Sequence, residues 1–403
     1  MYLLEKLMQR FVKVGTLTIL DVEGKPHVFK GEAGPEVTIR LRDRKLYRSL
    51  FLHPELKAGE AYVEGTLTVE KGTIRDFLTL SVMNARNLRK HPLQKLLNSG
   101  LKRMRKLHQR NTTKAARAHV HHHYDLSNEL YKLFLDKDMH YSCAYFSKPD
   151  DTLETAQQNK LRHIAAKLDL KPGQRVLDIG SGWGGMALYL AAAADVEVLG
   201  VTLSTEQLAL ATQRAKERGL ENRVKFKLMD YRDVKGTFDR IVSVGMFEHV
   251  GVVHYNEFFS HVRDLLKPDG VALLHSIGRK GGPSATGSWI RKYIFPGGYS
   301  PALSEVFPAV ERAGFWATDV EILRLHYANT LRAWEENFQS NREQITRLMD
   351  ERFCRMWEFY LIVSELSFAY GKHMVFQIQL TKERDTLPLT RDYMAKVEAS
   401  LKA

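Results

Sequence analysis

The stretch Val176-Leu-Asp178-Ile-Gly180-Ser-Gly182-Trp-Gly184-Gly185 joins a short apolar run to a cluster of glycines. The apolar run has the length of a buried strand, and the segment 184–194 has helical spacing. Glycines at alternate positions let the backbone approach a ligand closely. The stretch therefore predicts a strand, a tight turn and a helix that form a ligand-binding corner of an α/β sheet.

Strand-like and helix-like segments alternate on both sides of this corner. The expected strands are 175–180, 196–203, 224–230, 238–245, 271–277, 315–325 and 373–380, and the expected helices are 184–194, 205–219, 255–266 and long segments between 330 and 369. Such alternation predicts a doubly wound, mostly parallel seven-stranded sheet with a Rossmann-like arrangement.

An acidic residue, Asp178, stands two residues before the first glycine of the turn. The spacing Asp-x-Gly-x-Gly-x-Gly differs from the Gly-x-Gly-x-x-Gly of a pyrophosphate site. A carboxylate here would repel a phosphate and suits the cationic sulfonium of S-adenosylmethionine. The turn therefore favours a methyltransferase over an NAD enzyme, and Asp178 is expected either to contact the cofactor or to order the turn.

The ends of the second and third strands supply further candidate cofactor residues. A ribose-binding acid is expected after the second strand, but this chain has Thr202 and Gln207 there. Both can hydrogen-bond the ribose or the amino-acid tail without a carboxylate. After the third strand, Asp230 is expected to accept from the adenine amine and Tyr231 to stack on the ring.

The N-terminal residues read as a separate, smaller unit. Residues 1–14 have one apolar face at helical spacing, which favours packing in a core or dimer over insertion into a membrane surface. Residues 15–85 show the strand pattern at 15–22, 37–41 and 65–69 and a helical pattern at 74–83. We therefore expect an α/β accessory domain over residues 1–85.

The positive charge is concentrated in one segment. The 403 residues include 60 Lys and Arg and 47 Asp and Glu, a net charge of +13. Eleven basic residues and no acidic residue lie between Arg86 and Arg117, which leaves the rest of the chain almost neutral. The segment 86–118 is therefore expected to be a basic linker helix that contacts an anionic surface, either lipid or nucleic acid.

Other features narrow the class of protein. No apolar run approaches the ~18 residues of a membrane span, and the first residues lack a signal-peptide pattern. Two cysteines, Cys143 and Cys354, are too few for a disulfide framework. Adjacent histidines at 121–123 cannot all face one ion on a helix, so no metal site is expected. These features predict a soluble cytoplasmic protein.

Seven short motifs occur in a fixed order between residues 119 and 380. They are His123-Tyr124-Asp-Leu-Ser-Asn128, His140-Tyr-Ser-Cys143-Ala-Tyr-Phe146, Leu177-Asp-Ile-Gly-Ser-Gly-Trp-Gly-Gly185, Thr202-Leu-Ser with Gln207, Gly245-Met-Phe-Glu248-His-Val-Gly251, Leu274-His275-Ser-Ile277-Gly278 and His326-Tyr327-Ala328. Together they resemble the cyclopropane-fatty-acid synthase family, which includes bacterial synthases and mycolic acid cyclopropane synthases. The resemblance implies that residues 119–403 form the catalytic domain and that the N-terminal part is an accessory, lipid-interaction domain.

The resemblance also implies a reaction. Family members add the methyl carbon of S-adenosylmethionine across a cis double bond of an acyl chain in a membrane phospholipid. The resulting carbocation closes to a cyclopropane ring when a bound bicarbonate removes a proton. The residues that match the bicarbonate site are Cys143, Glu248, His275, Ile277 and Tyr327.

The motifs assign the cofactor site and the partners in the same way. The matching cofactor residues are Tyr124, Tyr141, Ser142, Asp178, Gly180, Gly182, Thr202, Gln207, Asp230 and Tyr231. A homodimer on the inner face of the membrane, with unsaturated phospholipid as substrate, is implied.

Three alternatives stay open from the sequence. Relatives make methyl- or methylene-branched chains from the same cation. A non-catalytic lipid-binding protein and a nucleic-acid methyltransferase are the others, and the absence of base-pocket and RNA-binding motifs argues against the last.

Overall fold

The computed structural model describes residues 1–90 and 127–401, and within them the chain forms two compact units. Unit 1 contains residues 1–90, Ser284–Pro296 and Leu331–Lys372. Unit 2 contains residues 127–283, Gly297–Thr330 and 373–401. Most of the basic segment 86–118, the histidines 121–123 and Tyr124 lie outside the described residues.

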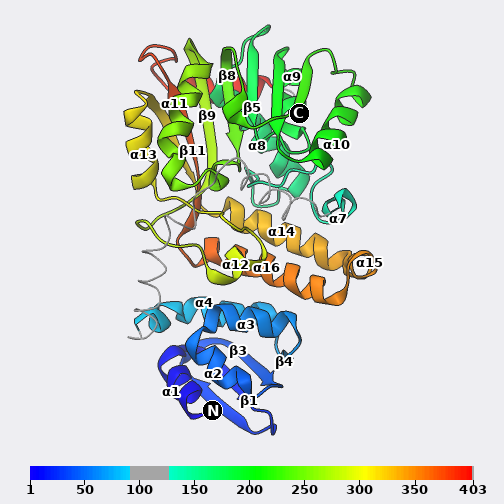
Figure 1. Cartoon of the computed structure of the whole chain (residues 1–403), viewed down its shortest axis with the longest axis vertical. Coiled ribbons are helices and arrows are strands. Elements are labelled where there is room, and N and C mark those ends of the chain that lie inside the picture. The colour runs from blue at the N-terminus through cyan, green and yellow to red at the C-terminus, as the bar shows by residue number, and fades with distance from the viewer. Residues whose placement is uncertain (91–126, 402–403) are drawn as a thin grey trace. The chain divides into compact units, whose positions relative to one another are not determined.

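Unit 1 is built on a four-stranded sheet in the order β2-β1-β3-β4, with β1 parallel to β3 (Figure 1). Its strands are β1 (Val14–Leu20), β2 (Pro26–Lys30), β3 (Glu32–Leu41) and β4 (Leu67–Lys71). Its helices are α1 (Tyr2–Phe11), α2 (Lys45–Leu52), α3 (Pro54–Val63), α4 (Ile74–Lys90), α12 (Ser288–Tyr293), most of α14 (His326–Ser340), α15 (Arg342–Leu348) and α16 (Glu351–Ala369).

The amphipathic patterns explain how unit 1 packs. Leu4, Leu7, Met8 and Phe11 recur at helical spacing in α1 and are buried, as the packing interpretation of residues 1–14 predicts. Helix α16 packs against α3 and α4. Its Phe359 contacts Trp289 of α12, with ring centroids 4.6 Å apart and the ring planes tilted by 53°. Glu365 of α16 is buried and accepts from the guanidinium groups of Arg75 and Arg332.

Unit 2 contains the predicted seven-stranded sheet, in the order β10-β11-β9-β8-β5-β6-β7. Strand β11 runs antiparallel to both of its neighbours, and the other neighbouring pairs are parallel. The strands are β5 (Arg175–Ile179), β6 (Glu197–Thr202), β7 (Val224–Leu228), β8 (Phe238–Val244), β9 (Leu266–Arg279), β10 (Trp316–Leu323) and β11 (His373–Thr381). The doubly wound α/β class predicted from the sequence is confirmed.

Helices cover both faces of this sheet (Figure 1). Helices α8 (Leu153–Leu168), α9 (Gly185–Ala194) and α10 (Thr205–Glu217) pack on one face of the sheet. Helices α11 (Tyr255–Leu265) and α13 (Leu303–Arg312) pack on the other face. The sheet core is Val-, Ile- and Leu-rich, as expected for strands buried on both sides. Short helices α7 (Asn128–Lys132) and α17 (Asp392–Ser400) complete the unit.

Two features of the fold differ from the sequence-based expectation. The segments 284–296 and 331–372 pack with unit 1, although the motif order grouped them with residues 119–403. Helical periodicity shows that a segment has an apolar face and does not show which partner covers it. Strand β2 and helices α2, α3 and α8 were not predicted.

Across the described residues, no helix has the length and apolar character that crossing a membrane requires.

Candidate active site

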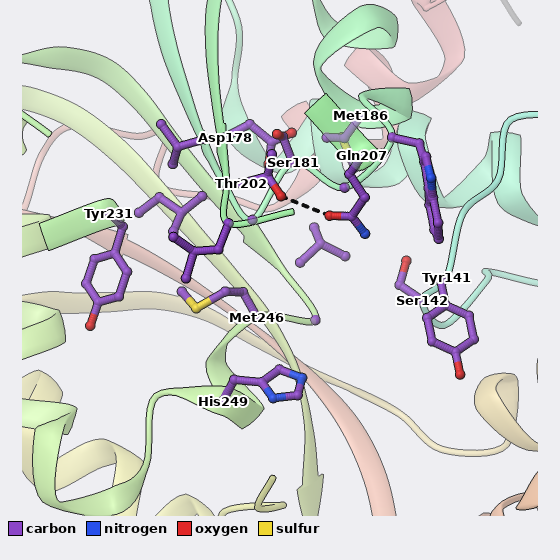
Figure 2. A pocket seen from close by; sticks show the side chains of 18 of the residues that line it. Tyr141, Ser142, Asp178, Ser181, Met186, Thr202, Gln207, Tyr231, Met246 and His249 are labelled. Atoms are coloured by element: carbon purple, nitrogen blue, oxygen red, sulfur yellow. Dashed lines mark hydrogen bonds between the residues drawn. The ribbon is translucent and has the colours of Figure 1, made fainter. Parts of the chain in front are cut away.

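A pocket opens at the carboxyl ends of β5, β6, β7 and β8 (Figure 2). This is where an open α/β sheet places its ligands, because the strand order reverses between β5 and β8. Nine of the ten predicted cofactor residues line the pocket: Tyr141, Ser142, Asp178, Gly180, Gly182, Thr202, Gln207, Asp230 and Tyr231. The tenth, Tyr124, is outside the described residues.

Glycines 182 and 185 shape the floor of the pocket. Gly182 has φ of +53°, and a Cβ there would meet no described atom within 4 Å, so its backbone borders the pocket openly. A Cβ on Gly185 would lie 2.4 Å from Nε2 of His140. The turn therefore needs glycine for its backbone conformation at one position and for close approach of a side chain at the other.

Asp178 lies at the end of β5 and is 2% exposed. Burial raises the pKa of its carboxyl to about 7, and nearby Lys160 opposes that rise. Its Oδ2 atom has no hydrogen-bond partner in the described chain. An unsatisfied buried oxygen at the pocket wall is suited to a cationic or hydrogen-bond-donating ligand group.

The side chains of Thr202 and Gln207 form a hydrogen bond with each other at the N-terminus of α10. Thr202 Oγ1 donates to Gln207 Oε1 over 2.9 Å, so the amide nitrogen of Gln207 remains available as a donor on the pocket side (Figure 2). Ser204 caps α10 by accepting from the Gln207 N–H over 3.3 Å. At the end of β6 the pocket is therefore lined by neutral groups, where a ribose-binding acid would be expected.

The Asp230 carboxylate, which is predicted to accept from an adenine amine, already accepts hydrogen bonds from Arg232. The donors are Nε and Nη2 of Arg232, over 2.8 Å and 2.7 Å, in a bidentate pair. An adenine amine would therefore share this carboxylate with Arg232. Tyr231 packs edge-on against Phe258 with ring centroids 5.4 Å apart, which holds its ring at the pocket wall.

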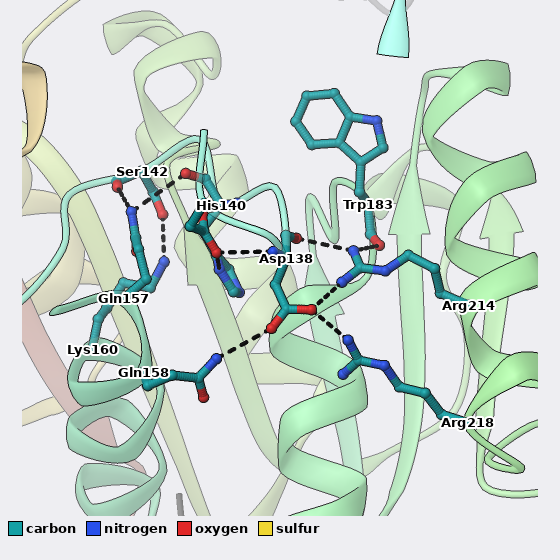
Figure 3. A network of polar contacts seen from close by, with 10 residues as sticks. Asp138, His140, Ser142, Gln157, Gln158, Lys160, Trp183, Arg214 and Arg218 are labelled. Atoms are coloured by element: carbon teal, nitrogen blue, oxygen red, sulfur yellow. Dashed lines mark hydrogen bonds and ion pairs between the residues drawn. The ribbon is translucent and has the colours of Figure 1, made fainter. Parts of the chain in front are cut away.

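Residues 138–142 form a strap that is held by helices α8 and α10, and residues 139–142 of this strap line the pocket (Figure 3). From α10, Arg214 donates to the backbone oxygens of Asp138 and Trp183, both over 2.9 Å, and so ties the strap to the glycine turn. Asp138 also accepts from Arg218 and from Gln158 of α8. Gln157 of α8 donates to the backbone oxygen of Ser142 over 3.1 Å.

His140 of the strap faces the glycine turn as a neutral ring. Its Nδ1 lies 2.8 Å from Oδ2 of Asp136, and its Nε2 is buried without a described partner. Burial, with help from Lys160, lowers its pKa. With Asp136 as acceptor, Nδ1 carries the hydrogen and Nε2 is an acceptor.

Sequence reasoning missed two charged residues of this pocket, Arg232, which pairs with Asp230, and Lys160. Lys160 lies on α8, is 1% exposed, lines the pocket and donates to Ser142 Oγ over 2.9 Å. The helical face that includes Gln157, Leu161, Ile164 and Leu168 is buried around it. A lysine in the middle of an apolar-periodic face was the available signal.

Of the predicted bicarbonate residues, Glu248 and Ile277 are in direct contact. Glu248 lies in a single 3-10 turn after β8, and its Oε1 accepts from the Ile277 N–H of β9 over 2.6 Å. Its Oε2 is buried with no described partner. Burial raises its pKa to about 7, against the effect of the Ile277 hydrogen bond.

His275 lies two residues before Ile277 on β9 and is 2% exposed. Burial lowers its pKa to about 3, so the ring is neutral at physiological pH. Gln377 of β11 lies with Nε2 3.2 Å from His275 Nδ1. With the amide as donor, Nδ1 accepts and Nε2 carries the hydrogen.

Cys143 and Tyr327 come from other elements. Cys143 follows the strap, is 1% exposed, and donates from Sγ to the Ala144 backbone oxygen over 3.3 Å. Burial raises its pKa, so it is a thiol and not a thiolate. Tyr327 is buried near the start of α14. None of the five predicted bicarbonate residues lines the cofactor pocket.

Within the described ranges, no cluster of His, Cys, Asp and Glu has the makeup of a metal site.

Comparison with known proteins identifies the family. Residues 111–378 match the family model described as mycolic acid cyclopropane synthetase. The cyclopropane-fatty-acyl-phospholipid synthase of Escherichia coli (strain K12) is 41% identical over 357 residues, which cover 85% of this chain and 87% of the relative. A probable fatty acid methyltransferase of Pseudomonas putida is 39% identical over 376 residues, covering 89% of this chain and 92% of the relative.

Solved structures agree with this grouping. The cyclopropane synthase MmaA2 from Mycobacterium tuberculosis is 34% identical, has a TM-score of 0.63, and covers 66% of this chain and 97% of that structure. The mycolic acid cyclopropane synthase CmaA1, complexed with S-adenosylhomocysteine (SAH) and CTAB, is 35% identical, with a TM-score of 0.62 and the same coverage. The chain is therefore a member of the mycolic acid cyclopropane synthetase family and an S-adenosylmethionine-dependent methyltransferase.

Proposed function

We propose that this enzyme converts cis double bonds of phospholipid acyl chains into cyclopropane rings. The buried pair of Glu248 and the Ile277 N–H carries the proposal, because the pair fixes one carboxyl oxygen and leaves the other without a partner. Such an oxygen can hold a small protonated anion. Bicarbonate, when bound, would supply the base that removes a proton from the transferred methyl group.

The residues fit that anion by their hydrogen-bonding character. A neutral His275 with its hydrogen on Nε2 is a donor. The Cys143 thiol would donate to the anion by turning its one hydrogen away from the Ala144 oxygen. A carboxyl at Glu248 with a pKa of about 7 can both hold and release a proton near neutral pH. Tyr327 is proposed as a further donor on its motif position.

Burial of these groups would also protect the cation that forms when the alkene substrate attacks the methyl group. An alkene is a weak nucleophile and must be held against the methyl group, and the resulting carbocation would be quenched by water. Glu248, His275 and Cys143 are each less than 9% exposed, which supports a water-poor site around them. A dry site is needed for ring closure and would be a disadvantage for hydrolysis.

In the cofactor pocket, the same proposal places the cationic end of S-adenosylmethionine beside Asp178 and the glycine turn. Gln207 and Thr202 would hold the ribose or the amino-acid tail, and Asp230 and Tyr231 the adenine. Tyr141 and Ser142 would close the pocket from the strap.

The direct test is incubation of the purified enzyme with S-adenosylmethionine and vesicles of a monounsaturated phospholipid, followed by fatty-acid mass analysis. A mass gain of one methylene per converted chain is expected. Unchanged acyl chains, with SAH binding intact, would contradict a lipid substrate.

A second product has support from the comparisons. One of the relatives above is a probable fatty acid methyltransferase, so a methyl- or methylene-branched chain is the alternative. The cyclopropane and the methylene branch arise from one cation: loss of a methyl proton with C–C bond formation closes the ring, and a 1,2-hydride shift followed by loss of a methyl proton gives the methylene branch. A saturated methyl branch would need a hydride donor in addition. Chromatography against a cyclopropane standard separates them, and a branched product would replace the first proposal.

We further propose that the enzyme binds the membrane surface from the cytoplasmic side as a homodimer. The concentration of positive charge in residues 86–118 supports an anionic leaflet as partner. Binding to anionic vesicles should then weaken as salt rises. Salt-independent binding would point to apolar insertion, and preference for an oligonucleotide at physiological salt would oppose a lipid surface.

A further inference from the structure

We propose that Lys160 is a positioning residue of the cofactor pocket: it holds the Ser142 hydroxyl as a donor to a bound carboxylate-class anion and supplies the balancing positive charge. The anion is assigned to the amino-acid end of S-adenosylmethionine, and bicarbonate is the other source of the same chemistry. The proposal rests on the methyltransferase assignment and does not depend on which lipid product is formed.

The first support is the burial of an ammonium group that no described carboxylate pairs with directly. Lys160 is 1% exposed, while the other buried lysine of the same helix, Lys167, pairs with Asp319 and Glu321. A buried charge is costly unless it is paired and hydrogen-bonded. Burial lowers the Lys160 pKa to about 8, with Asp136, Cys143 and Asp178 opposing, so the group is still largely charged at neutral pH.

The second support is the direction of the Lys160–Ser142 hydrogen bond (Figure 3). An ammonium donates and cannot accept, so Ser142 Oγ is the acceptor over 2.9 Å. The serine hydroxyl must then direct its own hydrogen elsewhere, and Ser142 lines the pocket. Gln157, one turn earlier on α8, donates to the Ser142 carbonyl. Helix α8 therefore holds both the side chain and the backbone carbonyl of Ser142.

The third support is the charge pattern across the pocket. Lys160 and Ser142 offer a cation and a donor, and Asp178 offers an unpartnered carboxyl oxygen. The open backbone of Gly182 borders the same pocket. A zwitterionic amino-acid group, with its ammonium toward Asp178 and its carboxylate toward Ser142, satisfies all of these groups together.

The test compares two ligands that differ in that group. Calorimetry would measure binding of SAH and of 5′-methylthioadenosine, which keeps the adenosine and sulfur and lacks the amino-acid end. In Lys160→Met, SAH affinity should fall about tenfold or more, while affinity for 5′-methylthioadenosine should change less than about twofold. Lys160→Arg should recover part of the SAH affinity.

Two controls separate positioning from stability. Lys167→Met removes a buried lysine two turns along the same helix and away from the pocket, and it should lower the melting temperature without a selective loss of SAH binding. If Lys160 acts through Ser142, Ser142→Ala should weaken SAH binding in wild type and add little in Lys160→Met.

The remaining outcomes decide the proposal. Equal losses for both ligands in Lys160→Met, or unchanged SAH binding with an unchanged bicarbonate dependence of activity, would overturn it. If Lys160→Met binds SAH normally but needs a higher bicarbonate concentration for activity, Lys160 still positions an anion, and that anion is bicarbonate. A failure to make cyclopropane chains would leave these binding results intact, so the two proposals fail separately.

Discussion

Two groups of buried polar side chains lie at the carboxyl ends of the same sheet and differ in charge. The cofactor pocket contains an ammonium group, that of Lys160, which opposes the burial-driven rise in the pKa of Asp178. Where β8 ends beside β9, burial favours the uncharged forms of Glu248 and His275, and only neutral hydrogen-bond donors oppose the rise in the pKa of Glu248. The first environment suits a ligand with charges of both signs. The second suits a proton transfer beside a short-lived cation, where a permanent charge would attract water.

The largest effect should come from Glu248→Gln. The amide keeps the shape and can still accept from the Ile277 N–H, but it cannot hold and release a proton. We expect kcat to fall at least about 100-fold while SAH affinity stays within about twofold. Steady-state kinetics and SAH calorimetry on the same preparation measure both. A large loss of SAH affinity would show that the two environments are one site.

Asp178→Asn tests the cofactor pocket, the first of the two environments. It removes the negative charge that balances a cationic ligand group, so SAH affinity should fall about tenfold. Once the enzyme is saturated with cofactor, kcat should recover most of its wild-type value. A kcat loss that saturation does not restore would give Asp178 a role in the chemical step.

These two environments were not equally visible in the sequence. The strand and turn pattern predicted the sheet and seven of the nine lining residues, because both depend on local spacing. The other two, Tyr141 and Ser142, were implied by the family resemblance. Lys160 was missed because its pocket position depends on how α8 packs on the sheet. The pairing of Glu248 with the Ile277 N–H joins residues far apart in the chain, and only the parallel alignment of β8 and β9 brings them together.

Gln377→Met should have a smaller effect on the chemical step. Gln377 is 1% exposed, and its amide sets the tautomer of His275 by donating to Nδ1. Methionine keeps the volume and removes the donor, so we expect kcat to fall about fivefold with SAH affinity unchanged. Equal kcat in the variant and wild type would mean that His275 needs no such partner.

The smallest expected effect is a pH dependence of stability. Burial raises the Glu248 pKa in the folded state to about 7 from an unfolded value of 4.5. The folded state therefore holds the proton more tightly, and stability falls as pH rises from about 4.5 to about 7. Glu248→Gln lacks this loss, so its melting temperature relative to wild type should be several degrees higher at pH 8 than at pH 4.5.

A pH-independent difference in melting temperature would contradict the neutral character assigned to the β8–β9 environment.

The fatty-acid profile of cells that produce the enzyme tests the central claim most directly. Cells with the wild-type chain should convert monounsaturated phospholipid acyl chains into cyclopropane chains, and cells with Glu248→Gln at equal protein level should not. Branched chains in place of cyclopropane chains, or equal profiles in the two strains, would contradict the proposed reaction.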